Sequence, residues 1–149
     1  MSGVSGIDQT VLDVQVLASA FMAGLIWFVQ LVHYPLFAAV PGGAFVDYER
    51  RHRNRTAAVV GLPMVAEGVT TLWLFLAPPG DLGRTLPFIG GVLLTVVLAS
   101  TVLVQVPLHD RLSTSYDRGH IRRLVATNWV RTVGWSARAV LALAMLHAA

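Results

Sequence analysis

Residues 86–108 have the sequence LPFIGGVLLTVVLASTVLVQVPL, which contains no charged side chain and one amide, Gln105, near its end. An α-helix needs roughly 20 consecutive apolar residues to cross the hydrocarbon core of a bilayer, so this run predicts a transmembrane helix. Three further apolar runs are long enough to cross as well: 11–37, 56–77 and 124–147. The sequence therefore predicts an all-α protein, with residues 1–149 forming one four-helix transmembrane bundle.

The composition agrees with an integral membrane protein. Hydrophobic residues make up 55% of the chain and charged residues 13%, whereas a soluble domain carries about twice this fraction of charge. Cysteine is absent, which excludes disulfides, thiolate metal sites and cysteine nucleophiles. The first residues are polar and acidic and include no basic segment, so we expect no cleavable signal peptide. We expect the chain in the cell membrane, with the lipid bilayer as its first partner.

The basic residues indicate the orientation in the membrane. All are arginine, and those of the connectors 40–55 and 109–123 fall on one side: Arg50, Arg51, Arg53, Arg55, Arg111, Arg118, Arg122 and Arg123. The opposite side holds Arg84 alone, beside Asp81 and an acidic N-terminus. The positive-inside rule places the arginine-rich side in the cytoplasm and both termini outside. Because the arginines flank apolar runs, we do not expect nucleic-acid binding.

Polar side chains inside the predicted spans gather toward the cytoplasmic half. They are Gln30, His33, Glu67, Gln105, His109, Asn128 and Arg131, with Arg138 one to two turns deeper than Glu67. Glu67 lies roughly 15 Å below the start of its helix. A charge in hydrocarbon costs several kcal/mol unless it is paired or hydrated. We therefore expect Arg131, Arg138 and Glu67 to meet inside the bundle.

The first and third spans resemble each other in sequence. Each places a glutamine about one turn before a histidine, with a proline beside it: Gln30, His33 and Pro35 in one span, and Gln105, Pro107 and His109 in the other. Two related helical hairpins around a pseudo-twofold axis would produce this pattern.

Each polar residue also has a structural interpretation. His33 and His109 are either interfacial histidines or parts of one shared site, and His52, one turn after Tyr48, lies either in a solvated connector or at that site. Glu67 and Arg138 form either a structural ion pair or a functional one, since ionisable groups inside a membrane are commonly functional.

Two kinds of cofactor suit these residues. His33, His109, Glu67 and His52 offer imidazole and carboxylate ligands, which bind non-haem iron, copper or zinc. Alternatively, His33 and His109 are axial ligands of a haem between two helices. Amide and guanidinium groups would orient the ligands or hold an anionic or carbonyl substrate, and they are Gln30, Gln105, Asn128, Arg131 and Arg138.

Two segments resemble a known family. Val106-Pro-Leu-His-Asp-Arg-Leu112, followed by Asn128-Trp-Val-Arg-Thr132, is similar to the anthrone-oxygenase-like family of small four-helix membrane proteins, and the segment His33-Tyr-Pro35 is similar in style. The resemblance covers about a third of the chain. It implies oxidation of an aromatic or quinone-like substrate without a conventional cofactor. His109 stands where the family pattern has asparagine, which favours a metal or a different substrate. A fainter similarity is to four-helix haem-binding oxidases of porphyrin metabolism, which carry a histidine in the first helix.

The function expected from these observations is a membrane oxidoreductase that acts on a hydrophobic substrate with a polar head. His33 and His109 would be ligands or proton-transfer groups, Glu67 an acid/base group or third ligand, and Arg138 would keep Glu67 ionised. One alternative is a non-enzymatic subunit or a small ion or solute transporter. Because four helices enclose little volume, such a transporter would need to form a homo-oligomer. A third is hydrolysis or lipid-headgroup transfer, with Glu67 as the base and arginines as phosphate clamps.

Overall fold

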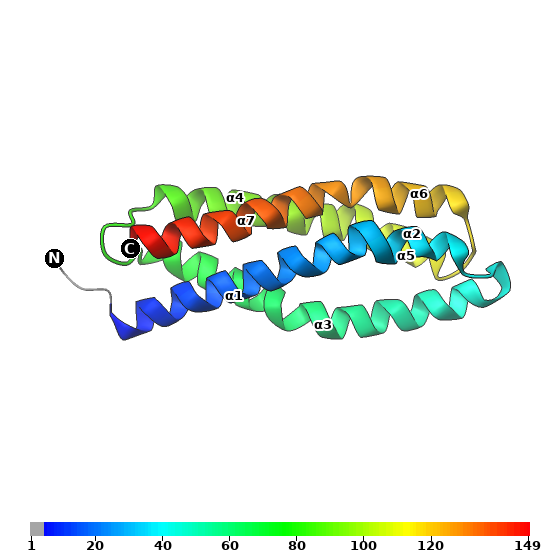
Figure 1. The fold of residues 1–149 in the computed structure, drawn as a ribbon, viewed down its shortest axis with the longest axis horizontal. Helices are drawn as coiled ribbons and strands as arrows, with labels where there is room; N and C mark the ends of the chain where they lie inside the picture. The colour runs from blue at the N-terminus through cyan, green and yellow to red at the C-terminus, as the bar shows by residue number, and fades with distance from the viewer. Residues whose placement is uncertain (1–4) are drawn as a thin grey trace.

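A computed structural model describes residues 5–149 as four long helical rods and contains no strand in that part of the chain (Figure 1). The first rod consists of α1 (Gly6–Phe28), the π-helical turn η1 (Val29–His33), α2 (Tyr34–Leu36) and the 3-10 turn η2 (Phe37–Ala39). The second rod is α3 (Gly42–Leu76). The third consists of α4 (Thr85–Ser100), the π-helical turn η3 (Thr101–Gln105) and α5 (Val106–Leu112), and the fourth of α6 (Arg118–Thr127) and α7 (Trp129–Ala148). The predicted all-α class is confirmed.

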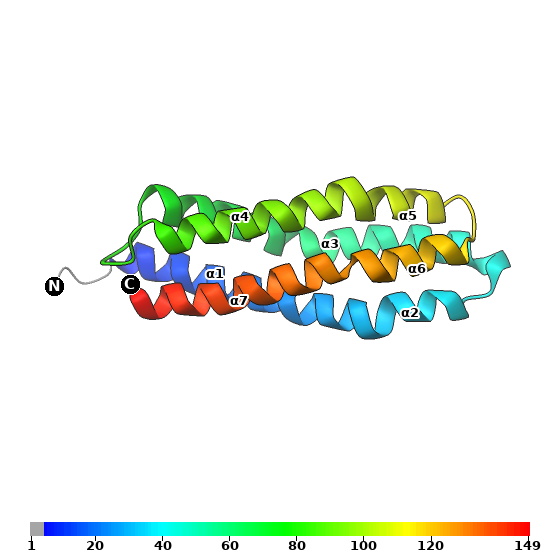
Figure 2. The same cartoon turned by 90° about the horizontal axis from the view of Figure 1, so that it is seen from above.

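The rods alternate in direction, and each packs against the next one along the chain (Figures 1 and 2). Helix α1 also packs along α7, which closes the four rods into a ring. The start of α1 and the C-terminus lie at one end of the bundle, and we call the other end, where α3 begins, the arginine-rich end (Figure 1). The prediction about a signal peptide concerns the first residues, of which 1–4 lie outside the described part.

Within residues 5–149, three helices are long and apolar enough to cross a membrane: Gly6–Ala39, Gly42–Leu76 and Thr85–Leu112. The fourth rod does not meet that criterion. It still presents apolar side chains outward, as the other rods do. Each rod has a strongly exposed apolar residue, and examples in chain order are Leu17, Leu62, Leu103 and Val140. Exposed apolar faces of this kind are rare in soluble monomers and are compatible with contact to lipid.

The two arginine-rich connectors are much shorter than predicted. Helix α3 begins at Gly42, so residues 40–55 are mostly helical rather than a loop. Polar side chains support this extension, as in the ion pair between Asp47 and Arg51, spaced four residues apart, at 2.9 Å. The second connector shrinks to residues 113–117, because α5 runs to Leu112 and the Asp117 carboxylate caps α6 by accepting from the His120 amide. The bundle therefore continues well beyond the apolar spans at this end.

The two prolines of the sequence repeat explain the π-helical turns. Tyr34 donates its amide hydrogen to Val29 and Val106 donates to Thr101, each across five residues, and the next residue in each case is a proline. Proline has no amide hydrogen, and its ring collides with the carbonyl four residues earlier in a regular helix. A single widened turn before the proline relieves that collision. The likeness of the first and third spans thus extends to their backbones.

Two apolar cores fill the bundle at its two ends. The larger, at the arginine-rich end, includes Phe37, Phe45 and Leu124, and the smaller includes Leu12 and Leu74. Helices α4 and α7 approach closely at Gly134, where an added Cβ would lie 2.4 Å from Cγ2 of Val97. Valine is stiff about χ1, so its side chain cannot turn aside easily.

Gly134→Ala should therefore destabilise the bundle by about 1–3 kcal/mol, the usual cost of overpacking. Gly68→Ala is the matched control, because no atom lies within 4 Å of a Cβ added there, and alanine favours helix more than glycine does. Unfolding of both variants in mild detergent measures the difference. Equal stability of the two variants would contradict the close approach of α4 and α7.

Candidate functional site

Buried polar side chains form two separate clusters along the bundle. The deep cluster consists of Gln15, Ser19, Glu67, Thr70, Thr71, Trp135 and Arg138. The histidine cluster, at the arginine-rich end, consists of His33, Tyr34, Glu49, His52 and His109. Glu49 and Glu67 belong to the same helix, and at 1.5 Å per residue they lie roughly 27 Å apart.

The deep cluster is centred on a fully buried ion pair. Glu67 Oε1 accepts from Arg138 Nε at 3.0 Å and from the Ser19 hydroxyl at 2.6 Å, and its Oε2 accepts from Trp135 Nε1 at 2.8 Å. Arg138 donates as well to the Gly90 carbonyl and to the Thr71 hydroxyl. These partners come from α1, α3, α4 and α7, so one cluster connects all four rods.

This geometry gives the Glu67–Arg138 pair a structural role. The two residues meet, as their predicted depths require, but both carboxylate oxygens of Glu67 are occupied. Glu67 is 0% exposed and lies in a different layer from His33 and His109, so the structure does not bring it to the histidines as a third ligand or as an acid/base group.

Arg131 and the two predicted glutamines lie between the clusters. Gln30 accepts from Asn128 at 2.9 Å and donates to the Val125 carbonyl, and Gln105 donates to the Thr127 hydroxyl at 2.9 Å. Both π-helical turns are thereby attached to the junction of α6 and α7. Arg131 does not join Glu67; it donates to Asn128 and lies over the ring of Trp135 at 5.2 Å.

The histidine cluster is assembled from three rods. His33 and Tyr34 end the π-helical turn η1 and begin α2, Glu49 and His52 lie on the extended first part of α3, and His109 lies on α5. Phe37 packs edge-on against His33 and His52, and His52 lies 4.6 Å from His33 and 5.4 Å from His109 between ring centroids. Aromatic rings thus fill the space between His33 and His109, which leaves no gap for a haem between them.

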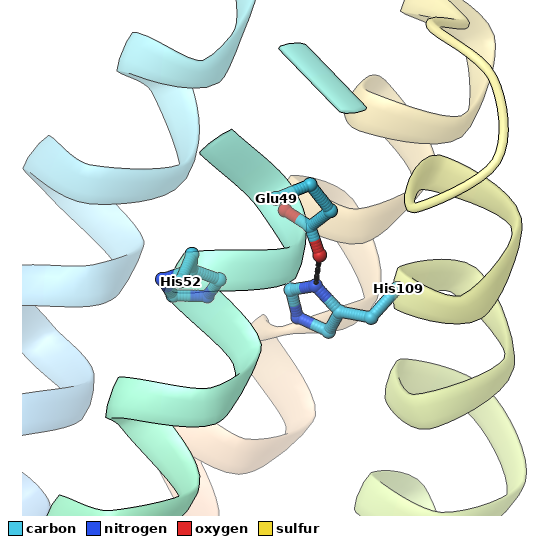
Figure 3. A group of neighbouring side chains, drawn as sticks. All are labelled: Glu49, His52 and His109. Carbon is cyan, nitrogen blue, oxygen red and sulfur yellow. Dashed lines mark hydrogen bonds and ion pairs between the residues drawn. The ribbon is translucent and has the colours of Figure 1, made fainter. Parts of the chain in front are cut away.

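Glu49 and Tyr34 are the members of this cluster that the sequence interpretation missed, and Glu49 is the one that can ligate a metal. It is 0% exposed, and its Oε1 lies 2.5 Å from His109 Nδ1 (Figure 3). His52 follows it by three positions, so both side chains project from one face of α3. The spacing Glu-x-x-His recurs at the metal sites of four-helix bundles, and it was the available signal.

Two consecutive residues, His33 and Tyr34, hold the rings of His52 and His109 in place. His33 Nε2 lies 2.8 Å from His52 Nδ1, and the Tyr34 hydroxyl lies 2.9 Å from His109 Nε2. Groups bonded to the second nitrogen of a ligating imidazole set its tautomer and orientation. His33, which was predicted to be a ligand, therefore occupies the position of a group that orients His52, and Tyr34 does the same for His109.

Glu49, His52 and His109 can together hold a metal ion. Each offers one ligand atom, and the three atoms lie within 4.8 Å of one another (Figure 3). The second oxygen of Glu49 is buried and has no hydrogen-bond partner within residues 5–149. An unpaired buried carboxylate oxygen is costly, and a cation between the three side chains would satisfy it.

No protein-family model, characterised protein or solved structure matches this chain significantly. The resemblance to the anthrone-oxygenase-like family therefore stays a prediction.

Removing the charge of Glu67 should destabilise the bundle strongly. Glu67→Leu leaves Arg138 buried without its counter-charge, which costs about 3–5 kcal/mol. Asp47→Asn is the matched control, because it removes an exposed ion pair that contributes less than about 1 kcal/mol. Unfolding in mild detergent separates the two. If Glu67→Leu were as stable as Asp47→Asn, the deep cluster would not be what holds the rods together.

Proposed function

We propose that this chain is a membrane oxidoreductase in which Glu49, His52 and His109 bind a non-haem iron ion beside the membrane surface. The substrate would be a hydrophobic molecule with a polar head, aromatic or quinone-like, that enters from the lipid. The observation that carries the proposal is the convergence of two imidazoles and one carboxylate from two rods, with one buried carboxylate oxygen that has no hydrogen-bond partner among residues 5–149.

The ligand set favours iron and redox chemistry. Two histidines and one carboxylate that leave other coordination positions open are typical of non-haem iron oxygenases. The ion would supply the redox chemistry, while Tyr34 and His33 would orient His109 and His52. The same residue types also suit zinc, so the identity of the metal is part of the test.

The position of Glu67 supports a location of the site beside the membrane surface. If the Glu67–Arg138 pair lies near the bilayer centre, Leu76 lies roughly 14 Å from it toward one surface and Arg55 roughly 18 Å toward the other. The hydrocarbon core extends about 15 Å from its centre. At the same rise per residue, His52 and Glu49 lie roughly 23 Å and 27 Å from the pair, so the candidate site lies outside the hydrocarbon at the arginine-rich end, at the outer edge of the headgroup layer and beyond it.

We infer four membrane spans, with the arginine-rich end in the cytoplasm and both termini outside. Within the fourth rod, the charged residues of α7 are Arg131 and Arg138, which face inward and are 9% and 2% exposed. The outer face of α7 carries Val133 and Val140, which are 62% and 68% exposed. An inward-facing, hydrogen-bonded charge is the form that membrane helices tolerate.

The purified protein loaded with Fe²⁺ under anaerobic conditions should bind one ion per chain. His52→Ala, His109→Ala and Glu49→Ala should each lose at least tenfold in affinity, because each removes a ligand. His147→Ala, at the other end of the bundle, is the control. Metal analysis after dialysis measures binding, and oxygen uptake with a lipophilic hydroquinone measures turnover.

Retention of the ion in all three ligand variants would refute the site. If the purified protein contained one zinc ion per chain and took up no oxygen, the redox function would be refuted and the metal site would stand. A metal-free wild-type protein would instead favour the non-enzymatic subunit or transporter predicted as the alternative.

Tyr34→Phe should weaken Fe²⁺ binding by roughly tenfold, the lower end of the usual effect of removing a group that orients a metal ligand. Tyr48→Phe removes a hydroxyl from a half-buried tyrosine nearby that forms no hydrogen bond within the described chain, so its affinity should not change. Equal affinities for the two variants, measured by competition with a chelator, would show that Tyr34 does not orient His109.

A further inference from the structure

A groove of about 440 Å³ runs between the first rod and α3 and reaches the histidine cluster. The first rod contributes Leu25, Phe28, Val29 and His33, and α3 contributes Tyr48, Arg51, His52, Arg55, Thr56 and Val59. The groove therefore shares His33 and His52 with the region around the proposed metal site, but it opens to the outside of the bundle.

The two ends of this groove differ in polarity. Arg51, His52 and Arg55 lie at the arginine-rich end, whereas Val59 lies one turn further along α3, roughly 6 Å deeper into the bundle. Leu25 lies two turns before His33 on the antiparallel first rod and lines the same deeper end. A groove that is basic at one end and apolar at the other matches a molecule with an anionic head and a hydrocarbon body.

The basic end of the groove carries a net positive charge. Arg51 forms an exposed ion pair with Asp47, and Arg55 forms no ion pair within residues 5–149. Arginine binds carboxylate and phosphate oxygens through parallel hydrogen bonds, which are stronger than those between neutral groups. Arg55 also lies at the depth of the lipid headgroups when Glu67 is near the bilayer centre.

Two other grooves on the bundle provide an internal comparison. One, between α3 and α4, is lined by residues such as Leu72, Phe75 and Phe88, and the other, between α4 and α7, by residues such as Leu93 and Val140. The residues that line these two grooves, all within the described chain, carry no charge. They suit lipid chains in general, whereas the groove beside the histidines can select by charge.

We propose that the groove between the first rod and α3 binds a single-chain amphiphile with an anionic head, a carboxylate or a phosphate, taken from the bilayer. The head contacts Arg55 and Arg51, and the chain lies against Leu25, Phe28 and Val59. This ligand is a different molecule from the aromatic or quinone-like substrate proposed above, and its head lies beside His52. Binding itself does not require the metal.

A photoreactive fatty acid with a diazirine in its chain tests this proposal on the full chain in bilayer nanodiscs. Peptide mapping should place most of the label on residues 25–33 and 48–59. The methyl ester of the same probe, which has no charge, should label those residues at least fivefold less. Arg55→Gln should reduce labelling by the acid about tenfold, whereas Arg50→Gln, an exposed arginine of α3 outside the groove, should leave it unchanged.

Equal labelling of the three grooves by the acid would overturn the proposal, and so would equal labelling by acid and ester. If Arg55→Gln and Arg50→Gln reduced labelling by the acid equally, the label would report only a general attraction of anions to the arginine-rich end. That result would also overturn the proposal. The His109→Ala variant separates the two proposals, because it removes a metal ligand but no residue of the groove. If the wild-type protein showed selective labelling but bound no iron, the iron site would be refuted and the groove proposal would stand. If it bound iron but showed no selective labelling, the groove proposal would be refuted and the iron site would stand.

Discussion

The ion pair between Glu67 and Arg138 is the interaction on which the arrangement of the four rods depends. Two opposite charges in an apolar interior must meet, since either one alone would be costly there. Their remaining hydrogen-bonding groups are satisfied by Ser19, Trp135 and the Gly90 carbonyl, and this brings in the other rods. The pair thus determines which face of α3 and α7 points inward, and with it the rotation of α3 that aims Glu49 and His52 into the bundle.

The buried polar side chains are thus divided between two layers of one bundle. Within residues 5–149, every buried polar side-chain atom of the deep cluster has a hydrogen-bond partner, whereas one carboxylate oxygen of Glu49 in the histidine cluster has none. The π-helical turn η1 links the layers, because Gln30 within it is attached to Asn128 while His33 and Tyr34 at its end contact His52 and His109. The widened turn before Pro35 thus places two consecutive side chains, His33 and Tyr34, against the histidine cluster.

Apolar runs and helix depth predicted the helical rods and the meeting of Glu67 with Arg138, because both follow from local composition and rise per residue. The site was predicted only in part. His33, His52 and His109 were identified as candidates, but Glu49 was missed because residues 40–55 lack the apolar periodicity that marks a helix. The chain continues as α3 there through polar contacts, and the Glu-x-x-His spacing becomes informative only once that helix is recognised. Which groups could act as ligands and which could orient them depends on helix rotation, which spacing alone does not determine.

The most direct test of this account is an anomalous diffraction map at the iron edge, from crystals of the protein grown or soaked with Fe²⁺ in the absence of oxygen. A single strong peak is expected between the side chains of Glu49, His52 and His109, with no peak in the deep cluster. A peak bound by Glu67, or iron found only at surface carboxylates, would contradict the assignment of packing to one layer and chemistry to the other.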